Sequence, residues 1–230
     1  MIKEREPVPK VSTIAIDGPA ASGKTVVGRT LAKRLSFRFL DTGLMYRAMT
    51  LFALTSFVSS IDGPGLTKLA IESLINVTDD PSDIRVFLRN QDVTEQLHTT
   101  AVEEAVPRIS AIVGVRTALV TQQRDIAAPG SIVMVGRDIG TVVLIDADIK
   151  IFLEASAEER AKRRQTDHSK TVARQSIKEV RENLESRDRQ DTERTASPLK
   201  AADDAHIITT DGLSINQVVE QIINLTIARS

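Results

Sequence analysis

Residues 18–25 read GPAASGKT, and this octapeptide constrains the fold of the 230-residue chain more than any other feature. It matches the pattern G-x-x-x-x-G-K-[ST], in which glycines let successive backbone N–H groups converge on phosphate oxygens. An apolar run at residues 12–17 predicts a buried strand before it, and residues 25–35 carry apolar side chains at helical spacing after it. The N-terminus of that helix adds positive potential. The segment therefore predicts a phosphate-binding loop between a strand and a helix.

Two residues at the end of this loop, Lys24 and Thr25, carry side chains suited to a nucleoside triphosphate. Lys24 is expected to reach the β- and γ-phosphates of ATP, and the Thr25 hydroxyl is expected to bind Mg²⁺. The alternative is an ordinary strand–turn–helix with a chance Gly-Lys pair, which the flanking strand and helix disfavour. The predicted ATP-binding residues are Gly18, Pro19, Ala20, Ala21, Ser22, Gly23, Lys24, Thr25 and Val26, with Thr25 as the metal ligand.

Short apolar runs alternate with helical periodicity along most of the chain. Beyond residues 12–17, further strands are predicted at 37–40, 132–135, 149–153 and 206–210, and helices include 44–58 and 215–227. Strands that alternate with helices imply a largely parallel sheet with helices on both faces. The predicted fold class is α/β, with a central five-stranded parallel sheet covered by helices.

The pattern changes between residues 59 and 97. Residues 59–65 form a Ser/Gly/Pro-rich linker, and two β-rich runs, 85–88 and one near Val93, lie between clusters of turn residues. We expect a small β element here, inserted into the larger domain. Helical periodicity returns over 102–127, where Pro107 predicts a kink.

A basic helix is expected from Ala157, with Arg160, Lys162, Arg163 and Arg164 clustered on it. The polar stretch 165–171 predicts a mobile loop after this helix. A further helix is then expected to end near Arg187.

Composition excludes several classes of protein. Thirty basic residues nearly balance thirty-one acidic ones, whereas a dedicated nucleic-acid binder usually has a basic excess. The absence of cysteine excludes disulfides, zinc–thiolate sites and a cysteine nucleophile, and it fits a reducing compartment. Residues 1–10 lack the apolar stretch of a secretory signal, and no run reaches the roughly 18 apolar residues of a membrane span. We expect a cytoplasmic enzyme or regulator.

Three charged clusters outside the loop are candidates for a second part of the site. They are residues 41–47 (DTGLMYR), 136–141 (GRDIGT) and 187–194 (RDRQDTER). Ligands of doubly wound sheets bind at the carboxyl ends of the strands, which places Arg137 and Asp138 near the phosphates. For each cluster the alternative is a solvated group of charges that pair with one another, and for 187–194 alone both interpretations stay open.

Several stretches together resemble one known family. IAIDGPAASGKT, LDTGLMYRAMT, VGRDIGTVV followed by DA, KIFLEASAEERAKRR, and RDRQDTER followed by SPLKAADDA occur in its order and spacing, from about Thr13 to Asp211. The chain resembles the bacterial cytidylate kinases, which belong to the small nucleoside-monophosphate kinases. The resemblance implies a P-loop kinase core at 1–58 and 115–230, an inserted monophosphate-binding domain at 59–114, and a mobile lid at 162–180.

The resemblance also implies which residues contact the acceptor nucleotide. These are Thr42, Arg47 and Arg137 around the acceptor phosphate, Arg116 and Asp138 at the cytosine edge, Asp191 at the ribose hydroxyls, and Arg187 and Arg194 near the phosphates.

The implied reaction is transfer of the γ-phosphoryl group of ATP to CMP or dCMP, with Mg²⁺, giving ADP and CDP or dCDP. The catalytic residues would be Lys24, Arg187 and, at the root of the lid, Arg163 and Arg164. The expected partners are these small nucleotides, with neither nucleic acid nor membrane, and the expected state is a monomer.

Two departures from the family pattern stand out. The family usually has a serine nine residues before the arginine matched by Arg116, whereas this chain has Pro107. Residues 144–147 read LIDA in place of the usual Phe-Pro-Asp-Ala. The alternatives are a kinase of another small acceptor, such as UMP, another monophosphate or shikimate, a non-catalytic nucleotide-binding regulator, and a nucleic-acid-binding ATPase.

Overall fold

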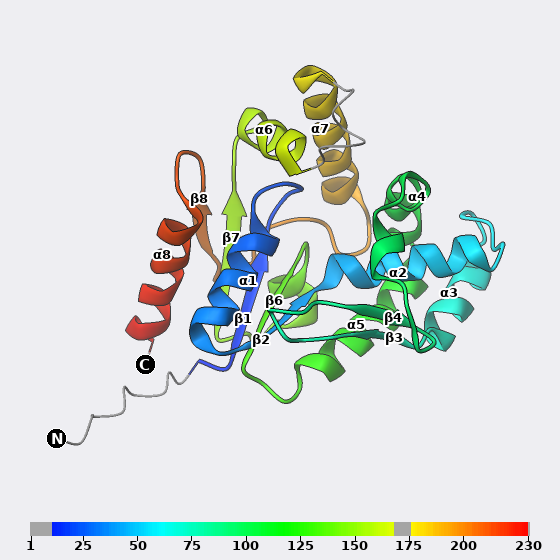
Figure 1. The fold of residues 1–230 in the computed structure, drawn as a ribbon, viewed down its shortest axis with the longest axis horizontal. Coiled ribbons are helices and arrows are strands. Elements are labelled where there is room, and N and C mark those ends of the chain that lie inside the picture. Colours follow the sequence, from blue (N-terminus) through cyan, green and yellow to red (C-terminus); the bar gives the residue numbers. More distant parts are fainter. Residues whose placement is uncertain (1–10, 168–175, 230) are drawn as a thin grey trace.

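The computed structural model describes residues 11–167 and 176–229, and at its centre lies a five-stranded sheet (Figure 1). The order of the strands is β2-β6-β1-β7-β8, and every neighbouring pair is parallel. The predicted α/β class with a central five-stranded parallel sheet is confirmed. The strands are β1 (Thr13–Asp17), β2 (Arg38–Asp41), β6 (Ile132–Gly136), β7 (Ile149–Glu154) and β8 (His206–Thr209).

Helices cover both faces of this sheet because its strands are apolar on both faces. On β1, Ile14 and Ile16 belong to one core cluster and Ala15 to the other, which is the alternation of a strand buried on both sides. The first cluster contains residues of α1 (Lys24–Leu35) and α8 (Ile215–Ala228), the second residues of α2 (Thr42–Thr55) and α5 (Val113–Ala127). No helix within the described ranges is long and apolar enough to cross a membrane.

Between α2 and α5 the chain forms a second sheet, which has three antiparallel strands. The predicted β element is therefore present, and the domain boundaries 59–114 stay a prediction. The predicted linker is partly helical, because Asp62 caps a helix by accepting a hydrogen bond from the Gly65 N–H. The elements of this region are α3 (Gly63–Glu72), β3 (Ile75–Val77), β4 (Val86–Leu88), β5 (Gln91–Asp92), the 3₁₀ turn η1 (Thr94–His98) and α4 (Thr100–Ser110).

The helical periodicity predicted over 102–127 corresponds to two separate helices, α4 and α5. The break lies at Ile112, whose backbone is extended, with φ −72° and ψ 120°. Pro107 lies inside α4 and does not end it. Val106 of α4 and Leu119 of α5 are buried in the same core cluster. The apolar periodicity therefore continues across the break and hides it.

Two further predicted boundaries change. α6 (Ala157–Asp167) includes residues 165–167, which the sequence assigned to a mobile loop, and residues 168–171 of that prediction lie outside the described part of the chain. α7 (Ile177–Glu193) continues past its predicted end near Arg187, from a start fixed by a capping box between Ser176 and Glu179. The longer helix places Arg187 and Asp191 one turn apart on the same face.

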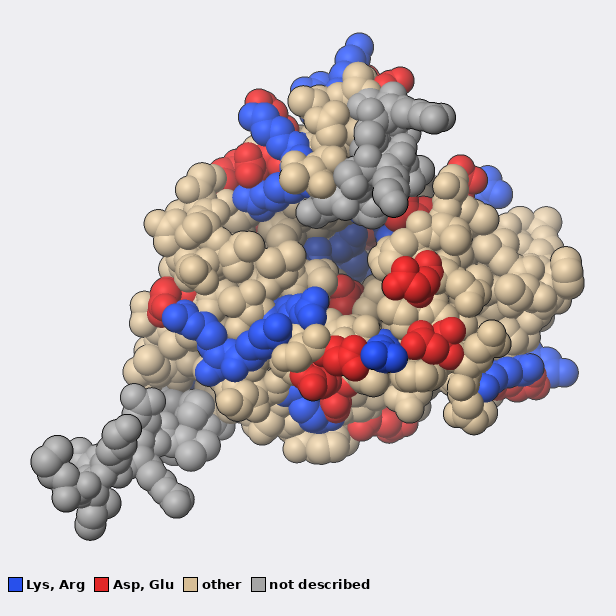
Figure 2. Space-filling model, in the orientation of Figure 1, with Lys and Arg blue, Asp and Glu red and all other residues tan. Residues whose placement is uncertain are grey.

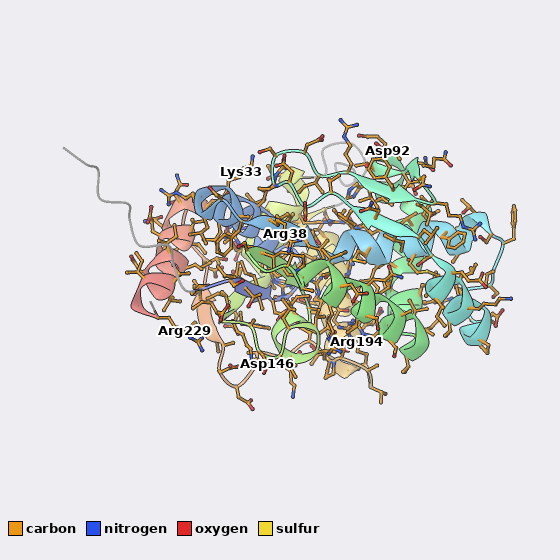
Figure 3. The ribbon with its side chains drawn as sticks, turned by 90° about the horizontal axis from the view of Figure 1, so that it is seen from below. Lys33, Arg38, Asp92, Asp146, Arg194 and Arg229 are labelled. Atoms are coloured by element: carbon orange, nitrogen blue, oxygen red, sulfur yellow. The ribbon has the colours of Figure 1, made fainter. Side chains whose placement is uncertain are left out.

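Seen from below in Figure 3, α8 and the small sheet lie at opposite ends of the molecule. Between them, the guanidinium of Arg38 on β2 joins three segments. It donates hydrogen bonds to the carbonyl oxygens of Gly130 at 2.8 Å and Ile126 at 2.9 Å, and to the Asp79 carboxylate at 2.9 Å. Because Asp79 closely follows β3, this side chain holds the small sheet against the central one.

We predict that Gly28→Ala destabilises the fold, because α1 contacts the sheet at this glycine. A Cβ at Gly28 would lie 2.5 Å from Val135 Cγ1 and 3.0 Å from Phe39 Cε2, both buried. At so close an approach we expect overpacking at the upper end of its usual range, about 2–3 kcal/mol. The better helix propensity of alanine returns about 1 kcal/mol, which leaves a net loss of about 1–2 kcal/mol in urea unfolding. Gly63→Ala is the control, since nothing lies within 4 Å of its added Cβ. Equal stability of Gly28→Ala and the parent would contradict this packing.

Candidate active site

The loop 18–25 leaves β1 at the carboxyl edge of the sheet and enters α1 at Lys24. Two of its glycines have a left-handed backbone, with φ of +148° at Gly18 and +94° at Gly23. A Cβ at Gly18 would lie 2.2 Å from the carbonyl oxygen of Leu153, so a larger residue does not fit there. The first N–H groups of α1 have no partner within the helix and are suited to an anion.

Lys24 is buried beneath this loop, with 7% of its surface exposed. Its ammonium donates to the carbonyl oxygen of Pro19 at 2.6 Å and to Ser22 Oγ at 3.3 Å. Burial lowers the pKa of Lys24 well below its usual value, and the neighbouring Arg137 adds to this effect. A polyphosphate placed here would therefore supply the anionic partner that the lysine needs in order to keep its charge.

A cavity of about 560 Å³ opens next to Lys24. This volume lies within the usual range of small-molecule sites, roughly 300–1,000 Å³. Figure 2 shows the hollow beneath the part of the surface formed by α6 and α7, with basic side chains inside it. Of the predicted site residues, Gly18, Pro19, Ser22, Gly23 and Arg163 do not line it. Those that line it are Ala20, Ala21, Lys24, Thr25, Val26, Thr42, Arg47, Arg116, Arg137, Asp138, Arg164, Arg187, Asp191 and Arg194.

One buried carboxylate, which the sequence analysis missed, joins the loop to the segment after β6. Asp17, the last residue of β1, pairs with Gly136, the last residue of β6. It accepts hydrogen bonds from the N–H groups of Ile139 and Gly140, both at 2.8 Å. Burial raises the pKa of Asp17 to about 6, and these hydrogen bonds oppose that rise. An acidic residue at the end of an apolar strand was the available sequence signal.

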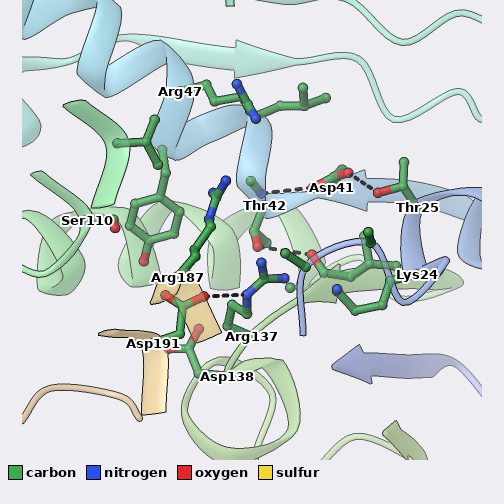
Figure 4. A pocket seen from close by; sticks show the side chains of 18 of the residues that line it. Lys24, Thr25, Asp41, Thr42, Arg47, Ser110, Arg137, Asp138, Arg187 and Asp191 are labelled. Atoms are coloured by element: carbon green, nitrogen blue, oxygen red, sulfur yellow. Dashed lines mark hydrogen bonds and ion pairs between the residues drawn. The ribbon is translucent and has the colours of Figure 1, made fainter. Parts of the chain in front are cut away.

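A network of arginines surrounds Asp191 of α7 (Figure 4). Arg137 donates to Asp191 Oδ2 at 2.8 Å and to the Gly18 carbonyl oxygen at 3.1 Å, and Arg194 contacts Asp191 Oδ1 at 3.3 Å. Burial favours the neutral acid, but the charges of Arg137, Arg194 and Arg187 hold the pKa of Asp191 below its ordinary value. Burial, with Arg137 nearby, lowers the pKa of Arg187 to about 10. An added anion would relieve this concentration of positive charge.

Glu103 of α4, also missed by the sequence analysis, joins two predicted site arginines. Its carboxylate lies 3.4 Å from Arg47 of α2 and 3.2 Å from Arg164 of α6. Arg47 also donates to the carbonyl oxygen of Leu97 at 3.0 Å. Burial lowers the pKa of Arg47, and the charge of Glu103 opposes this. Side chains from three helices therefore meet on one side of the cavity.

Arg116 and Asp138 form a buried ion pair, in which each side chain is 4% exposed and the N–O distance is 2.5 Å. Arg116 comes from α5, and Asp138 follows β6. The same guanidinium donates to the carbonyl oxygen of Ser110 at 3.1 Å and lies 5.0 Å from the centre of the Tyr46 ring. The structure thus brings together the two residues that the resemblance implied for base recognition.

Thr25 and Asp41 place two hard oxygen donors at the loop, of which the sequence analysis identified only the first as a metal ligand. The Thr25 hydroxyl donates to Asp41 Oδ2 at 2.6 Å, and Asp41 Oδ1 accepts from the Gly43 N–H at 2.9 Å. Within the described ranges, no group of three or more His, Cys, Asp or Glu residues could hold a metal. The donor set suits Mg²⁺, which usually takes one or two protein oxygens besides phosphates and water.

Two predicted site residues use their polar groups for contacts within the protein. The Thr42 hydroxyl donates to the carbonyl oxygen of Val135 at 3.0 Å, although Thr42 lines the cavity. Arg163 lies outside the cavity, where it contacts Glu159 at 3.0 Å and donates to Thr210 at 2.9 Å. The geometry therefore supports Arg164 as a cavity residue better than Arg163.

The helices α6 and α7, which the sequence places at the base of the predicted lid, are tied to the phosphate loop. Arg160 of α6 pairs with Asp188 of α7 and donates to the carbonyl oxygen of Ala20 at 3.2 Å. Asp188 in turn accepts from the Ala20 N–H at 3.3 Å. One ion pair therefore joins both helices to the backbone of the loop.

Comparison with known proteins places the chain in a family. The family model described as cytidylate kinase matches residues 14–228. Cytidylate kinase of Pelotomaculum thermopropionicum is 46% identical over 215 residues, covering 91% of this chain and 93% of the relative. That of Carboxydothermus hydrogenoformans is 44% identical over 212 residues, covering 92% and 96%. The chain therefore belongs to the cytidylate kinase family, as the sequence resemblance implied.

Solved structures support the fold alone. Shikimate kinase from Acinetobacter baumannii, in complex with shikimate, has a TM-score of 0.51 and 16% identity, and covers 96% of each chain. Shikimate kinase from Bacteroides thetaiotaomicron has a TM-score of 0.51 and 15% identity, and covers 94% of this chain and 98% of its own. These likenesses agree with the central parallel sheet covered by helices.

We predict strong coupling between Arg116 and Asp138 in a double-mutant cycle. Arg116→Met or Asp138→Asn alone removes one partner of a buried ion pair, so each should cost about 3–5 kcal/mol in urea unfolding. The double variant leaves neither charge unpaired and should lose clearly less than the sum of the two single losses. Additive losses would show that the two side chains do not depend on each other.

Proposed function

We propose that this member of the cytidylate kinase family transfers the γ-phosphoryl group of ATP to CMP or dCMP, giving ADP and CDP or dCDP. The observation that carries the proposal is the cavity that joins the phosphate loop at Lys24 to the buried pair of Arg116 and Asp138. A phosphate cradle alone would fit any nucleoside triphosphatase. The polar pair at the other end of the same cavity supplies a binding site for a second, base-bearing nucleotide.

The donor end would hold the ATP phosphates. The backbone N–H groups after Gly18 and the ammonium of Lys24 would bind them, and the Thr25 hydroxyl, with Asp41 beside it, would hold Mg²⁺. When bound, the metal ion neutralises part of the charge on the phosphates. Lys24 would exchange its contacts with Pro19 and Ser22 for contacts with phosphate oxygens of ATP. Its ammonium would then stabilise the negative charge that develops on these phosphates during transfer.

The acceptor phosphate needs orientation rather than deprotonation. Its second pKa is near 6, so most of it is already a dianion at neutral pH and can attack without a general base. Three arginines that line the cavity, Arg137, Arg187 and Arg47, can approach the oxygens of the acceptor phosphate. Their charges would also stabilise the transferring group, whose negative charge is spread over three equatorial oxygens.

Arg116 and Asp138 would read the base. The cytosine edge presents an amino group as donor at one end and two acceptors, N3 and O2, beside it. A carboxylate next to a guanidinium presents the complementary order of acceptor and donors. Uracil has a carbonyl oxygen in place of the amino group, and this oxygen would face the Asp138 carboxylate. The pair therefore favours cytosine.

Exclusion of water protects ATP from hydrolysis during transfer. Arg164 of α6 already reaches the cavity, and closure of the predicted lid, 162–180, would bring further cations over it. Part of that segment lies outside the described residues. The monomeric state, the cytoplasmic location and the absence of nucleic-acid partners likewise stay predictions.

We predict that Lys24→Ala abolishes transfer while the fold is retained, because the ammonium that would bind the β- and γ-phosphates is lost. The measurement is the conversion of CMP to labelled CDP with ATP labelled in its γ-phosphate, together with far-ultraviolet circular dichroism. The matched control is Lys33→Ala, an exposed lysine of the same helix, which should keep parental activity. Near-parental transfer by Lys24→Ala would reject the assignment.

We predict that Asp138→Asn narrows the discrimination between CMP and UMP. The charged acceptor is replaced by an amide that can donate to the uracil oxygen, and a hydrogen bond to a charged group contributes about 1.5–3 kcal/mol. The ratio of kcat/KM for CMP to that for UMP should fall about 10- to 100-fold, with the KM for ATP little changed. Asp146→Ala, at an exposed carboxylate, is the control. Proportional losses for both acceptors, in a variant that far-ultraviolet circular dichroism shows to be folded, would mean that Asp138 does not read the base.

A further inference from the structure

We propose that Ser110, at the C-terminal end of α4, accepts a hydrogen bond from the exocyclic amino group of the acceptor cytosine and so determines specificity. This inference rests on the proposed function. It adds to the base site a residue that neither the sequence motifs nor the family resemblance identified.

Ser110 lies at the end of the cavity that is remote from the phosphate loop. It lines the cavity together with Arg116 and Asp138, and only 8% of its surface is exposed. In Figure 4, Ser110 lies on one side of the pocket, and Lys24 and Thr25 lie on the opposite side. A nucleotide whose phosphate faces Lys24 would therefore direct its base toward Ser110.

The guanidinium of Arg116 fixes Ser110 relative to Asp138. Nη1 donates to the Ser110 carbonyl oxygen at 3.1 Å, and Nη2 donates to Asp138 Oδ2 at 2.5 Å. Two other guanidinium nitrogens at this end, Arg116 Nε and Arg194 Nη2, are buried and have no hydrogen-bond partner among the described residues. Buried donors without partners are costly, so this end of the cavity is suited to a polar ligand.

The hydroxyl of Ser110 is oriented as an acceptor. Its proton is donated to the Pro107 carbonyl oxygen at 3.3 Å, which leaves the oxygen lone pairs for the ligand. The second carboxylate oxygen of Asp138, Oδ1, makes no hydrogen bond within the described part of the chain. Two acceptors, Oδ1 and Ser110 Oγ, therefore match the two N–H bonds of a cytosine amino group. Uracil has a carbonyl oxygen at that position, which is itself an acceptor and cannot donate a hydrogen bond to either of these two oxygens.

The helical position agrees with this role. Pro107 carries no hydroxyl and does not line the cavity; it borders a neighbouring hollow that shares Asp191 and Arg194 with the cavity. Ser110 is three residues further along the same helix and thus lies on nearly the same face. In this chain, α4 can therefore supply a hydroxyl to the base site from Ser110, whereas Pro107 has no hydroxyl to supply.

The test compares Ser110→Ala with the parent in steady-state kinetics with CMP and UMP. Loss of one neutral hydrogen bond should lower kcat/KM for CMP about three- to tenfold. The value for UMP should stay level or rise, and the KM for ATP should not change. Ser73→Ala is a matched control, because Ser73 is also buried at the end of a helix, α3, and donates to the carbonyl oxygen three residues earlier, Ala70 O, at 2.7 Å. Ser73 does not line the cavity, so its variant should keep the parental ratio.

An unchanged ratio of kcat/KM for CMP to UMP in Ser110→Ala would overturn the role of Ser110. Equal losses for both acceptors, accompanied by a lower melting temperature, would overturn it as well, since they would indicate a purely structural hydroxyl. If Ser110→Ala does not fold, Ser110→Cys carries the same expectation, because a thiol is a poor acceptor of similar size. The proposed function itself is tested by the parent protein: if the parent does not phosphorylate CMP, that function is rejected. If the parent is active and only the variants behave as described above, the role of Ser110 alone is rejected.

Discussion

The parallel pairing of β1 with β6 is the constraint on which the rest of the site depends. Its register places Asp17 opposite Gly136, so the phosphate loop and the segment carrying Arg137 and Asp138 leave the sheet at the same edge. The buried Asp17 carboxylate then binds two backbone N–H groups of the second segment. The phosphate loop and the acceptor segment are thus joined through backbone as well as side chains. These contacts keep the distance between the two ends of the cavity nearly constant.

Charge compensation explains how so many arginines share one cavity. Asp191, Glu103 and Asp138 each contact one or two of them, and these carboxylates come from α7, from α4 and from the segment after β6. The pairs fix the guanidinium groups in position before an anion is bound, which reduces the cost of organising them during transfer. Arg187 is the exception among the described cavity arginines, since it has no ion pair, and its lowered pKa reflects burial next to Arg137. It is therefore well suited to bind a phosphate directly.

Most of the fold and more than half of the residues that line the cavity could be predicted from the sequence. The phosphate loop has a local signature, and the five strands are short apolar runs whose ends carry the charged motifs. Local patterns did not reveal the break at Ile112, because both flanking helices bury apolar side chains in one core. Nor did they reveal Asp17 or Glu103, whose contacts join residues that are far apart in the sequence and meet only through packing. Arg163, whose role the family resemblance implied, does not line the cavity, and its guanidinium donates to Thr210 and to the Ser22 carbonyl oxygen of the phosphate loop.

The central claim is that one chain holds a triphosphate and a cytidine monophosphate in a single continuous cavity. The most direct test is calorimetric titration with adenosine and cytidine joined through an oligophosphate bridge. The account predicts that one molecule binds per chain, about a hundredfold or more tighter than ATP or CMP alone, because the second contact becomes intramolecular. Affinity no higher than that of ATP, or binding that CMP fails to displace, would contradict it.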